Sequence, residues 1–367
     1  MSPRTSSIPP HILAINPYVA GKPLEELARE FGILDAIKLA SNENPFGPSP
    51  RSVEAAQKAL LSAHRYPDAA QHAIRRRLAE HYGVTPEEVI VGAGSNELLD
   101  LLGRAFCVAG DHVVYGNPSF PIYRLVAQVN QLQATEVELD AEYVSDLEAT
   151  AAACRRDTRM VFLANPNNPT GTYVGGDRLL RFLDQVPEEV LVVLDEAYIE
   201  FVTSADFLDG NALRQRRHNL VVLRTFSKAY GLAGLRVGYG LARPDLIGVL
   251  DRVRAPFNVS GVAMAAAIAA LDDGGFVQRV VEVNASERER VSYAMVALGL
   301  TVYRSEANFV LAETPKSAQE LYQALLRRGV IVRPVGPGRV ARCVRISIGT
   351  ASENDRLLRA LREVLAG

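Results

Sequence analysis

The chain has 367 residues, 48% hydrophobic and 22% charged, a balance typical of a globular protein long enough for two domains. Its 40 basic and 42 acidic side chains give a formal net charge of -2, so no excess of positive charge indicates binding to nucleic acid or to an acidic membrane. The three cysteines lack metal-ligand spacing, and we find neither a signal peptide nor an apolar segment of membrane-spanning length. We therefore expect reduced thiols, no metal site, a cytoplasmic location and chemistry on a small molecule.

The first part of the chain is rich in residues that break regular structure. Residues 1–22 contain four prolines and one glycine. We therefore expect an irregular arm that crosses to a partner subunit. An amphipathic helix is predicted over 23–31 and a loop over 37–50. Two further helices are predicted, over 50–64 and 68–82.

From residue 85 the hydrophobic pattern alternates between strand and helix. The expected strands are 89–91, 112–115, 136–139, 159–164, 190–194 and 220–223, and the expected helices are 96–108, 122–128, 144–154 and 176–185. The strands are mostly unbroken runs of Val, Leu and Ile, as in a parallel sheet that helices cover on both faces. In such sheets ligands bind at the carboxyl ends of the strands.

The pattern changes after residue 244. We expect helices at 262–271, 276–298, 317–328 and 353–365, and strands at 307–312, 330–335 and 343–348. The predicted fold class is α/β, with a large domain on a mostly parallel central sheet (35–255) and a smaller α+β domain (256–367). The arm (1–34) is expected to join the small domain and a dimer interface.

Two of four stretches that directly follow predicted strands contain anchoring groups. Residues 92–97 (GAGSNE) open a helix, whose free N–H groups and dipole could hold a phosphate. The alternative is an ordinary helix start with Ser95 as its N-cap, which has the same sequence pattern. In residues 165–171 (NPNNPTG) two prolines fix the Asn168 carboxamide in a loop, where it could donate to a phenolate; the alternative is a simple turn.

The other two stretches contain a carboxylate and an amine. Asp195, in residues 195–198 (DEAY), ends a buried strand and needs a cation such as a protonated pyridine nitrogen, unless it is only an acidic cap. Lys228 lies in residues 225–236 (TFSKAYGLAGLR) with two hydroxyls and an arginine, a setting for a phosphate beside a nucleophilic amine, although a surface turn remains the alternative. Together the four stretches supply the parts that hold pyridoxal phosphate.

At this point the sequence resembles the fold-type-I pyridoxal-phosphate aminotransferases, and most closely the histidinol-phosphate aminotransferases. The resemblance extends over nearly the whole chain, from NPY at 16–18 to RISIG at 345–349. Its most specific marks are SNENP at 41–45, RYPD at 65–68, NNPTG at 167–171, DEAY at 195–198 and TFSK at 225–228.

The resemblance implies a role for each matching residue. Lys228 would form a Schiff base with the cofactor and carry a proton, Asp195 would pair with the pyridine nitrogen, and Asn168 and Tyr198 would hold the phenolate oxygen. Phe120 would stack on the ring, where many relatives have tyrosine. The residues expected at the phosphate are Gly94, Ser95, Asn96, Thr225, Ser227, Arg236 and, from the neighbouring subunit of a homodimer, Tyr66. Those expected at the substrate are Tyr18, Asn44, Arg333 and Arg345.

The implied reaction is transfer of the amino group of L-histidinol phosphate to 2-oxoglutarate in histidine biosynthesis. One alternative is an aromatic amino acid aminotransferase, because Phe120 and Phe257 offer apolar surface. A second is a decarboxylase of a phosphorylated amino acid on the same scaffold. A pyridoxal-phosphate-binding regulator is disfavoured, because residues 1–22 leave no space for a DNA-binding module ahead of the first helix.

Overall fold

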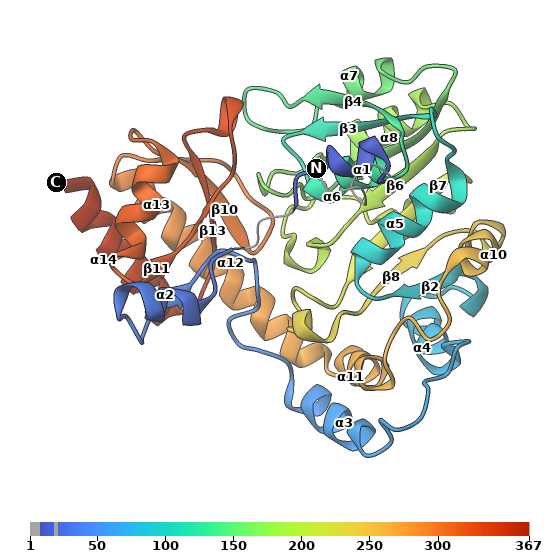
Figure 1. The fold of residues 1–367 in the computed structure, drawn as a ribbon, viewed down its shortest axis with the longest axis horizontal. Coiled ribbons are helices and arrows are strands. Elements are labelled where there is room, and N and C mark those ends of the chain that lie inside the picture. The colour runs from blue at the N-terminus through green and yellow to red at the C-terminus, as the bar shows by residue number, and fades with distance from the viewer. Residues whose placement is uncertain (1–7, 18–20, 367) are drawn as a thin grey trace.

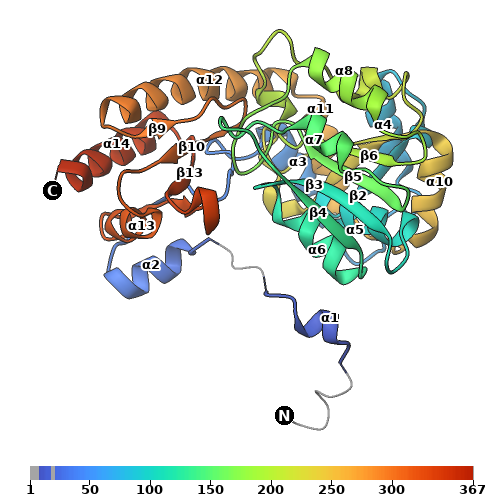
Figure 2. The same ribbon diagram turned by 90° about the horizontal axis from the view of Figure 1, so that it is seen from above.

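The computed structural model describes residues 8–17 and 21–366, which form a large and a small unit lying side by side (Figures 1 and 2). No helix within these residues combines the length and apolar character that crossing a membrane requires.

The large unit is built on a seven-stranded sheet. Its order is β2 (Val89–Gly92), β8 (Gly238–Leu241), β7 (Leu220–Thr225), β6 (Leu191–Asp195), β5 (Thr158–Ala164), β3 (His112–Asn117) and β4 (Gln133–Glu138). β8 runs antiparallel to both of its neighbours, and the other pairs are parallel. The carboxyl ends of β5, β6 and β7 therefore lie along one edge, where a ligand site is expected.

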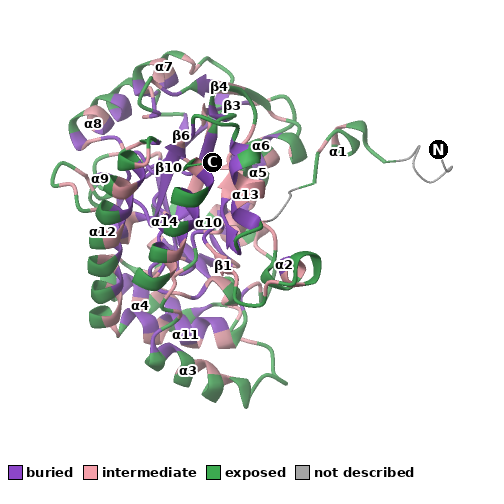
Figure 3. Ribbon diagram, turned by 90° about the vertical axis from the view of Figure 1, so that its left-hand side faces the viewer, coloured by how far each residue is buried: buried purple, intermediate pink, exposed green. Residues whose placement is uncertain are grey.

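Helices cover both faces of this sheet. The helices of the large unit are α3 (Pro50–Leu60), α4 (His72–Tyr82), α5 (Ser95–Phe106), α6 (Pro121–Val129), α7 (Leu147–Ala152), α8 (Gly176–Gln185), α9 (Gly210–Leu213), α10 (Pro244–Val253) and α11 (Gly261–Leu271). Along β6, Val192 and Leu194 pack in the core under α4, α8 and α11, whereas Val193 packs in the core under α5, α6 and α10. Figure 3 shows the buried strands between helices whose outer faces are exposed.

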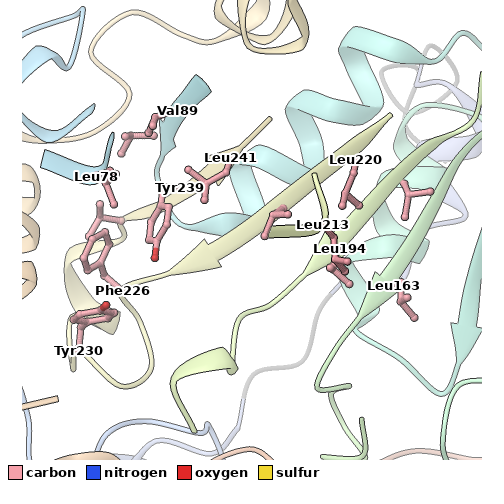
Figure 4. Close-up of a cluster of buried hydrophobic side chains, with 14 of the residues drawn as sticks. Leu78, Val89, Leu163, Leu194, Leu213, Leu220, Phe226, Tyr230, Tyr239 and Leu241 are labelled. Carbon is pink, nitrogen blue, oxygen red and sulfur yellow. The ribbon is translucent and has the colours of Figure 1, made fainter. Parts of the chain in front are cut away.

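The core under α4 and α11 reaches the loop that follows β7. Phe226 lies 4.9 Å from Tyr230 and 5.2 Å from Tyr239 between ring centroids, and Figure 4 shows the three rings grouped near Leu78. Buried aromatic contacts of this kind hold the chain rigidly on either side of residue 228.

Within the described residues, the small unit contains two short sheets and four α-helices. The four-stranded sheet has the order β12 (Arg333–Pro334), β13 (Cys343–Ser347), β10 (Phe309–Glu313) and β9 (Thr301–Val302), and β1 (Ile37–Lys38) pairs in parallel with β11 (Val330–Ile331). The helices are α2 (Leu24–Phe31), α12 (Gly274–Ala297), α13 (Ala318–Leu326) and α14 (Ala351–Ala366). A four-residue helix, α1 (Pro10–Leu13), precedes them in the arm.

Three elements of the large unit are not predicted from the sequence: β8, α9 and α10. Glycines at 238 and 240 hide β8 from a search for apolar runs, yet they are required there. A Cβ at Gly238 would lie 2.5 Å from the Ser95 nitrogen, and one at Gly240 would lie 3.1 Å from Ile90. Because neither glycine has a side chain, α5 and β2 can approach this strand closely.

The predicted division into domains differs from the observed packing. α11 was assigned to the small domain, but its buried alanines, such as Ala263 and Ala267, belong to the core of the large unit. Conversely, Leu39 was assigned to the large domain but packs in the core of the small unit. The predicted strand over 330–335 is two strands in different sheets, and β1 lies within the predicted loop over 37–50.

Helices α3 and α4 are shorter than predicted. α3 ends at Leu60 rather than 64, and α4 begins at His72 rather than 68. Asp68 forms a turn instead, because its carboxylate accepts the N–H groups of Ala70 and His72 at 2.9 and 2.8 Å.

Candidate active site

A cavity of about 270 Å³ lies at the carboxyl edge of the large sheet, and residues of both units line it. The predicted site residues at its wall are Ser95, Asn96, Phe120, Asn168, Asp195, Tyr198, Thr225, Ser227, Lys228, Arg236, Arg333 and Arg345. Residues 40–43, which follow β1, also line it.

Lys228 reaches the cavity from the loop after β7. Its Nζ donates to the carbonyl oxygens of Ser41 and Asn42 at 3.4 and 3.3 Å. Burial, and then the positive charge of Arg345, lower the pKa of Lys228 to about 7. A neutral and nucleophilic amine is therefore well populated near neutral pH.

Asp195 lies at the end of β6 with 4% of its surface exposed. Its Oδ2 accepts the Tyr123 hydroxyl at 2.9 Å and its Oδ1 accepts the Ala197 N–H at 3.2 Å. Burial raises the pKa of Asp195 to about 6, against the opposing effect of these hydrogen bonds. Both partners are neutral, so this carboxylate is suited to a cation that a ligand brings.

An anion cradle lies where α5 begins. Gly94 precedes the helix with a φ of 82°, and Ser95 and Asn96 form its first turn, whose N–H groups lack partners within the helix. Arg236 donates to the Ser227 hydroxyl at 3.4 Å, and a Cβ at Gly94 would overlap its guanidinium. Helix N–H groups, hydroxyls and a guanidinium are the donors that a phosphate dianion requires.

The two predicted phenolate-binding residues are both tied to the small unit. Asn168 accepts Arg345 Nη1 at 2.6 Å through its Oδ1. Tyr198 accepts an N–H from Asn42 at 3.0 Å, and its ring packs edge-on against Phe309 of β10 at 5.2 Å. Phe120 is the N-cap residue directly before α6 and packs edge-on against Tyr123 at 5.8 Å.

Arg333 and Arg345 lie opposite each other on the paired strands β12 and β13. Besides Asn168, Arg345 donates to the Ala40 carbonyl at 2.6 Å, and its guanidinium lies 5.5 Å from the Phe309 ring centroid. Two neighbouring guanidinium groups at the cavity wall are suited to a carboxylate or a phosphate.

Some predicted residues lie elsewhere. Asn44 is not at the wall of this cavity, and its side chain donates to the Ala229 carbonyl at 2.9 Å. Tyr66 is 83% exposed and stacks on Phe257 at 4.7 Å, also away from the cavity of its own chain. Tyr18 lies outside the described residues.

Among the residues at the site that sequence reasoning missed, Tyr123 and Asn42 make side-chain contacts with predicted site residues. Tyr123 looks like a core residue of an amphipathic helix, and nothing in its spacing points to Asp195. Asn42 lies in the motif SNENP, which is part of the family resemblance and points to this segment. The motif alone assigns no role to Asn42. The structure links Asn42 to Tyr198, Lys228 and Ser347.

Comparison with known proteins identifies the class to which this fold and site belong. Residues 35–361 match the model of the family described as aminotransferase class I and II, and the chain belongs to that family. The fold is that of the fold-type-I aminotransferases, so the predicted family and fold class are confirmed.

Within the family, the chain is similar to histidinol-phosphate aminotransferases. It is 47% identical to the histidinol-phosphate aminotransferase of Anaeromyxobacter sp. (strain Fw109-5), over 98% of this chain and 99% of that protein. It is 48% identical to histidinol-phosphate aminotransferase 2 of Pseudomonas aeruginosa, over 97% of each. The crystal structure of histidinol-phosphate aminotransferase from Sinorhizobium meliloti in complex with pyridoxal-5'-phosphate matches with a TM-score of 0.91 at 33% identity, covering 98% of both chains.

Proposed function

We propose that this chain is a pyridoxal-phosphate-dependent transaminase that moves the amino group of L-histidinol phosphate to 2-oxoglutarate in histidine biosynthesis. The products are imidazole acetol phosphate and glutamate. The observation that carries the proposal is a single cavity that combines Lys228, a buried Asp195, an anion cradle and two arginines. The similar proteins named histidinol-phosphate aminotransferase match over nearly the full length of the chain.

The residues at the cavity fit the cofactor. Its phosphate would be held at the start of α5 by Gly94, Ser95 and Asn96, and by Thr225, Ser227 and Arg236. Asp195 would face the pyridine nitrogen, Phe120 the ring, and Asn168 and Tyr198 the phenolate oxygen. When bound, pyridoxal phosphate supplies an electron sink for the electron pair released at the substrate carbon.

Lys228 is the proposed proton carrier. With a pKa of about 7, its Nζ exists as the free amine in an appreciable fraction near neutral pH and can accept the proton from the carbon that bears the amino group. The carbonyl oxygens of Ser41 and Asn42 hold Nζ at the cavity wall between transfers.

Arg333 and Arg345 are the proposed anchors for the charged ends of both substrates. Guanidinium groups donate to a phosphate or a carboxylate in the same forked geometry, so one pocket can bind histidinol phosphate and 2-oxoglutarate in turn. Asn44 and Tyr18 remain predicted substrate residues.

We also propose a cytoplasmic homodimer with shared sites. Tyr66 is exposed and does not line the cavity of its own chain, so a role at the phosphate requires a second subunit. Light scattering during size-exclusion chromatography would test the dimer. Activity regained on mixing Tyr66→Ala with Lys228→Ala protein would test the shared site, because one of the two sites in such a mixed dimer has both native residues.

Half-reactions test the function directly. The enzyme with bound cofactor is mixed with a single donor, and the change in the visible absorbance is followed. We expect histidinol phosphate to bleach the band, 2-oxoglutarate to restore it, and Lys228→Ala to abolish turnover. Turnover that survives in Lys228→Ala would refute the mechanism.

The same assay separates the alternatives. A band unaltered by histidinol phosphate but bleached by phenylalanine would establish the aromatic aminotransferase. Release of carbon dioxide from threonine phosphate would establish the decarboxylase.

A further inference from the structure

Asn42 is a buried residue that forms hydrogen bonds with two side chains of the site, Lys228 and Tyr198. It lies in the loop after β1 with 1% of its surface exposed and a φ of 54°. A positive φ is uncommon outside glycine, although asparagine tolerates it better than most residues. Such a conformation persists in a protein core when surrounding contacts enforce it.

Every polar group of Asn42 has a partner. Its side-chain Nδ2 donates to the Tyr198 oxygen at 3.0 Å, and its Oδ1 accepts the Ser347 hydroxyl at 3.0 Å. Its main-chain N–H donates to Ser347 Oγ at 2.8 Å, and its carbonyl accepts Lys228 Nζ at 3.3 Å and Asn308 Nδ2 at 3.0 Å. One residue therefore connects the lysine and the tyrosine of the large unit to the small unit.

The bond to Tyr198 has a definite chemical effect. An N–H donated to a phenol oxygen stabilises negative charge on that oxygen, which makes the phenol a stronger donor through its own O–H. It also occupies one side of the oxygen, so the hydroxyl proton is directed elsewhere. Ser347 fixes the orientation of the amide, because it accepts from the main chain and donates to the side chain of Asn42.

We propose that Asn42 is a positioning residue that sets how strongly Tyr198 donates its hydroxyl proton to a ligand oxygen in the cavity. Through Ser347 it also keeps Tyr198 and Lys228 in fixed relation to β13, the strand that carries Arg345. The inference rests on the proposed function, because the ligand oxygen is that of the cofactor.

Two variants separate the side chain of Asn42 from its backbone. Asn42→Gly accepts the positive φ and keeps the carbonyl that binds Lys228, but it removes the donor to Tyr198. Asn42→Asp has nearly the same shape but places an acceptor and a negative charge against Tyr198. Gln131→Gly is the matched control, because Gln131 is exposed and also has a positive φ, 56°, but does not line the cavity.

The readout is the pH at which the visible absorbance of the bound cofactor changes. Weaker donation from Tyr198 leaves more negative charge beside the nitrogen that Lys228 contributes to the chromophore, so the midpoint rises. We expect a rise of about 0.5 to 1 pH unit in Asn42→Gly, the equivalent of one hydrogen bond, and a larger rise in Asn42→Asp. The charged groups that act on Lys228 are Arg345, Glu43, Arg236 and Asp195, and no variant alters them.

Kinetics give a second readout. A positioning role predicts that kcat for the donor falls about fivefold in Asn42→Gly while KM changes little, because the lost interaction concerns the proton transfer and not substrate anchoring. Gln131→Gly should match the wild type in both measurements. Circular dichroism of each variant shows whether it is folded, and Asn42→Asp carries the test if Asn42→Gly is not.

The outcomes are distinguishable from failure of the proposed function. If the wild type forms no visible band with pyridoxal phosphate, the proposed function fails. If the wild type titrates but folded Asn42→Gly and Asn42→Asp titrate at the same pH as Gln131→Gly, the inference about Asn42 is overturned and the proposed function stands.

Discussion

Asp195 and Glu196 are consecutive carboxylates at the end of one strand, yet they have opposite surroundings. Both are buried, with 4% and 0% of their surfaces exposed. Asp195 faces the cavity and meets the hydroxyl of Tyr123. Glu196 faces the other side of the sheet, where Arg224 donates to its Oε2 at 2.9 and 2.7 Å and the Gly210 N–H donates to its Oε1 at 2.8 Å.

The difference teaches how a buried charge is used. Glu196 has its cation inside the protein: although burial alone lowers the pKa of Arg224, neighbouring acidic groups, Glu196 first among them, raise it well above its usual value. Burial raises the pKa of Glu196 to about 7, against the opposing charge of Arg224. Asp195 has neutral hydrogen-bond partners, and a cation must come from the ligand. Removing an internally paired carboxylate destabilises the fold because its cation is left uncompensated, whereas a buried carboxylate that forms no internal ion pair is suited to binding a ligand.

The largest expected effect is on stability, in Glu196→Gln. Loss of its charge leaves the guanidinium of Arg224 buried with a single carboxylate partner, Asp209. We expect a decrease of about 3 kcal/mol in the free energy of unfolding, measured in urea, while kcat of the folded protein stays close to the wild type. Unchanged stability would show that Asp209 alone compensates Arg224.

In Asp195→Asn the main effect is expected on activity rather than on stability. The amide keeps a hydrogen bond with Tyr123 but offers no charge to a ring nitrogen, so kcat/KM should fall about 100- to 1,000-fold. The affinity for pyridoxal phosphate, measured by fluorescence titration, should fall as well. An active Asp195→Asn enzyme would show that the carboxylate has no role in the reaction.

The pH dependence of unfolding tests the surroundings of Asp195 directly. The pKa of Asp195 is raised from 3.8 to about 6, so the folded cofactor-free protein retains a proton that the unfolded chain loses between these values. Its stabilising contribution is complete below pH 3.8 and is lost as the pH rises through 6. From pH 4 to 7 the wild type should lose about 2 to 3 kcal/mol relative to Asp195→Asn in urea unfolding of the cofactor-free proteins. If the free energies of unfolding of the two proteins changed in parallel with pH, the pKa of Asp195 would not be raised in the folded protein.

The smallest expected effect is in Tyr123→Phe. The ring would keep its stacking on Phe162, at 5.0 Å between centroids, and only the hydroxyl that donates to Asp195 is lost. One such bond is worth about 1 kcal/mol, so we expect kcat/KM to fall about fivefold. Tyr115→Phe is the matched control, because its hydroxyl donates to Glu136 instead and it does not line the cavity. Equal effects of the two substitutions would refute a specific link to Asp195.

Much of the large unit could be predicted because its strands are buried on both faces. Continuous apolar runs such as 220–223 identify such strands, and a polar residue directly after the run, such as Asp195, lies at the ligand edge. Most residues at the cavity were found in this way or through the family resemblance that their motifs carry.

The rest depends on tertiary contacts that no local pattern contains. The glycines of β8 are needed because another element comes close, and the alanines of α11 do not reveal which unit they pack against. Tyr123 reads as an ordinary core residue until its hydroxyl is seen beside Asp195. Tertiary packing also decides how 330–335 divides between two sheets.

The pairing of β1 with β11 also affects how the protein is made. Residues 37–38 leave the ribosome well before their partners at 330–331 are synthesised. The first segment cannot form these hydrogen bonds until residues 330–331 have been made, so a chain arrested before residue 330 cannot complete the small unit.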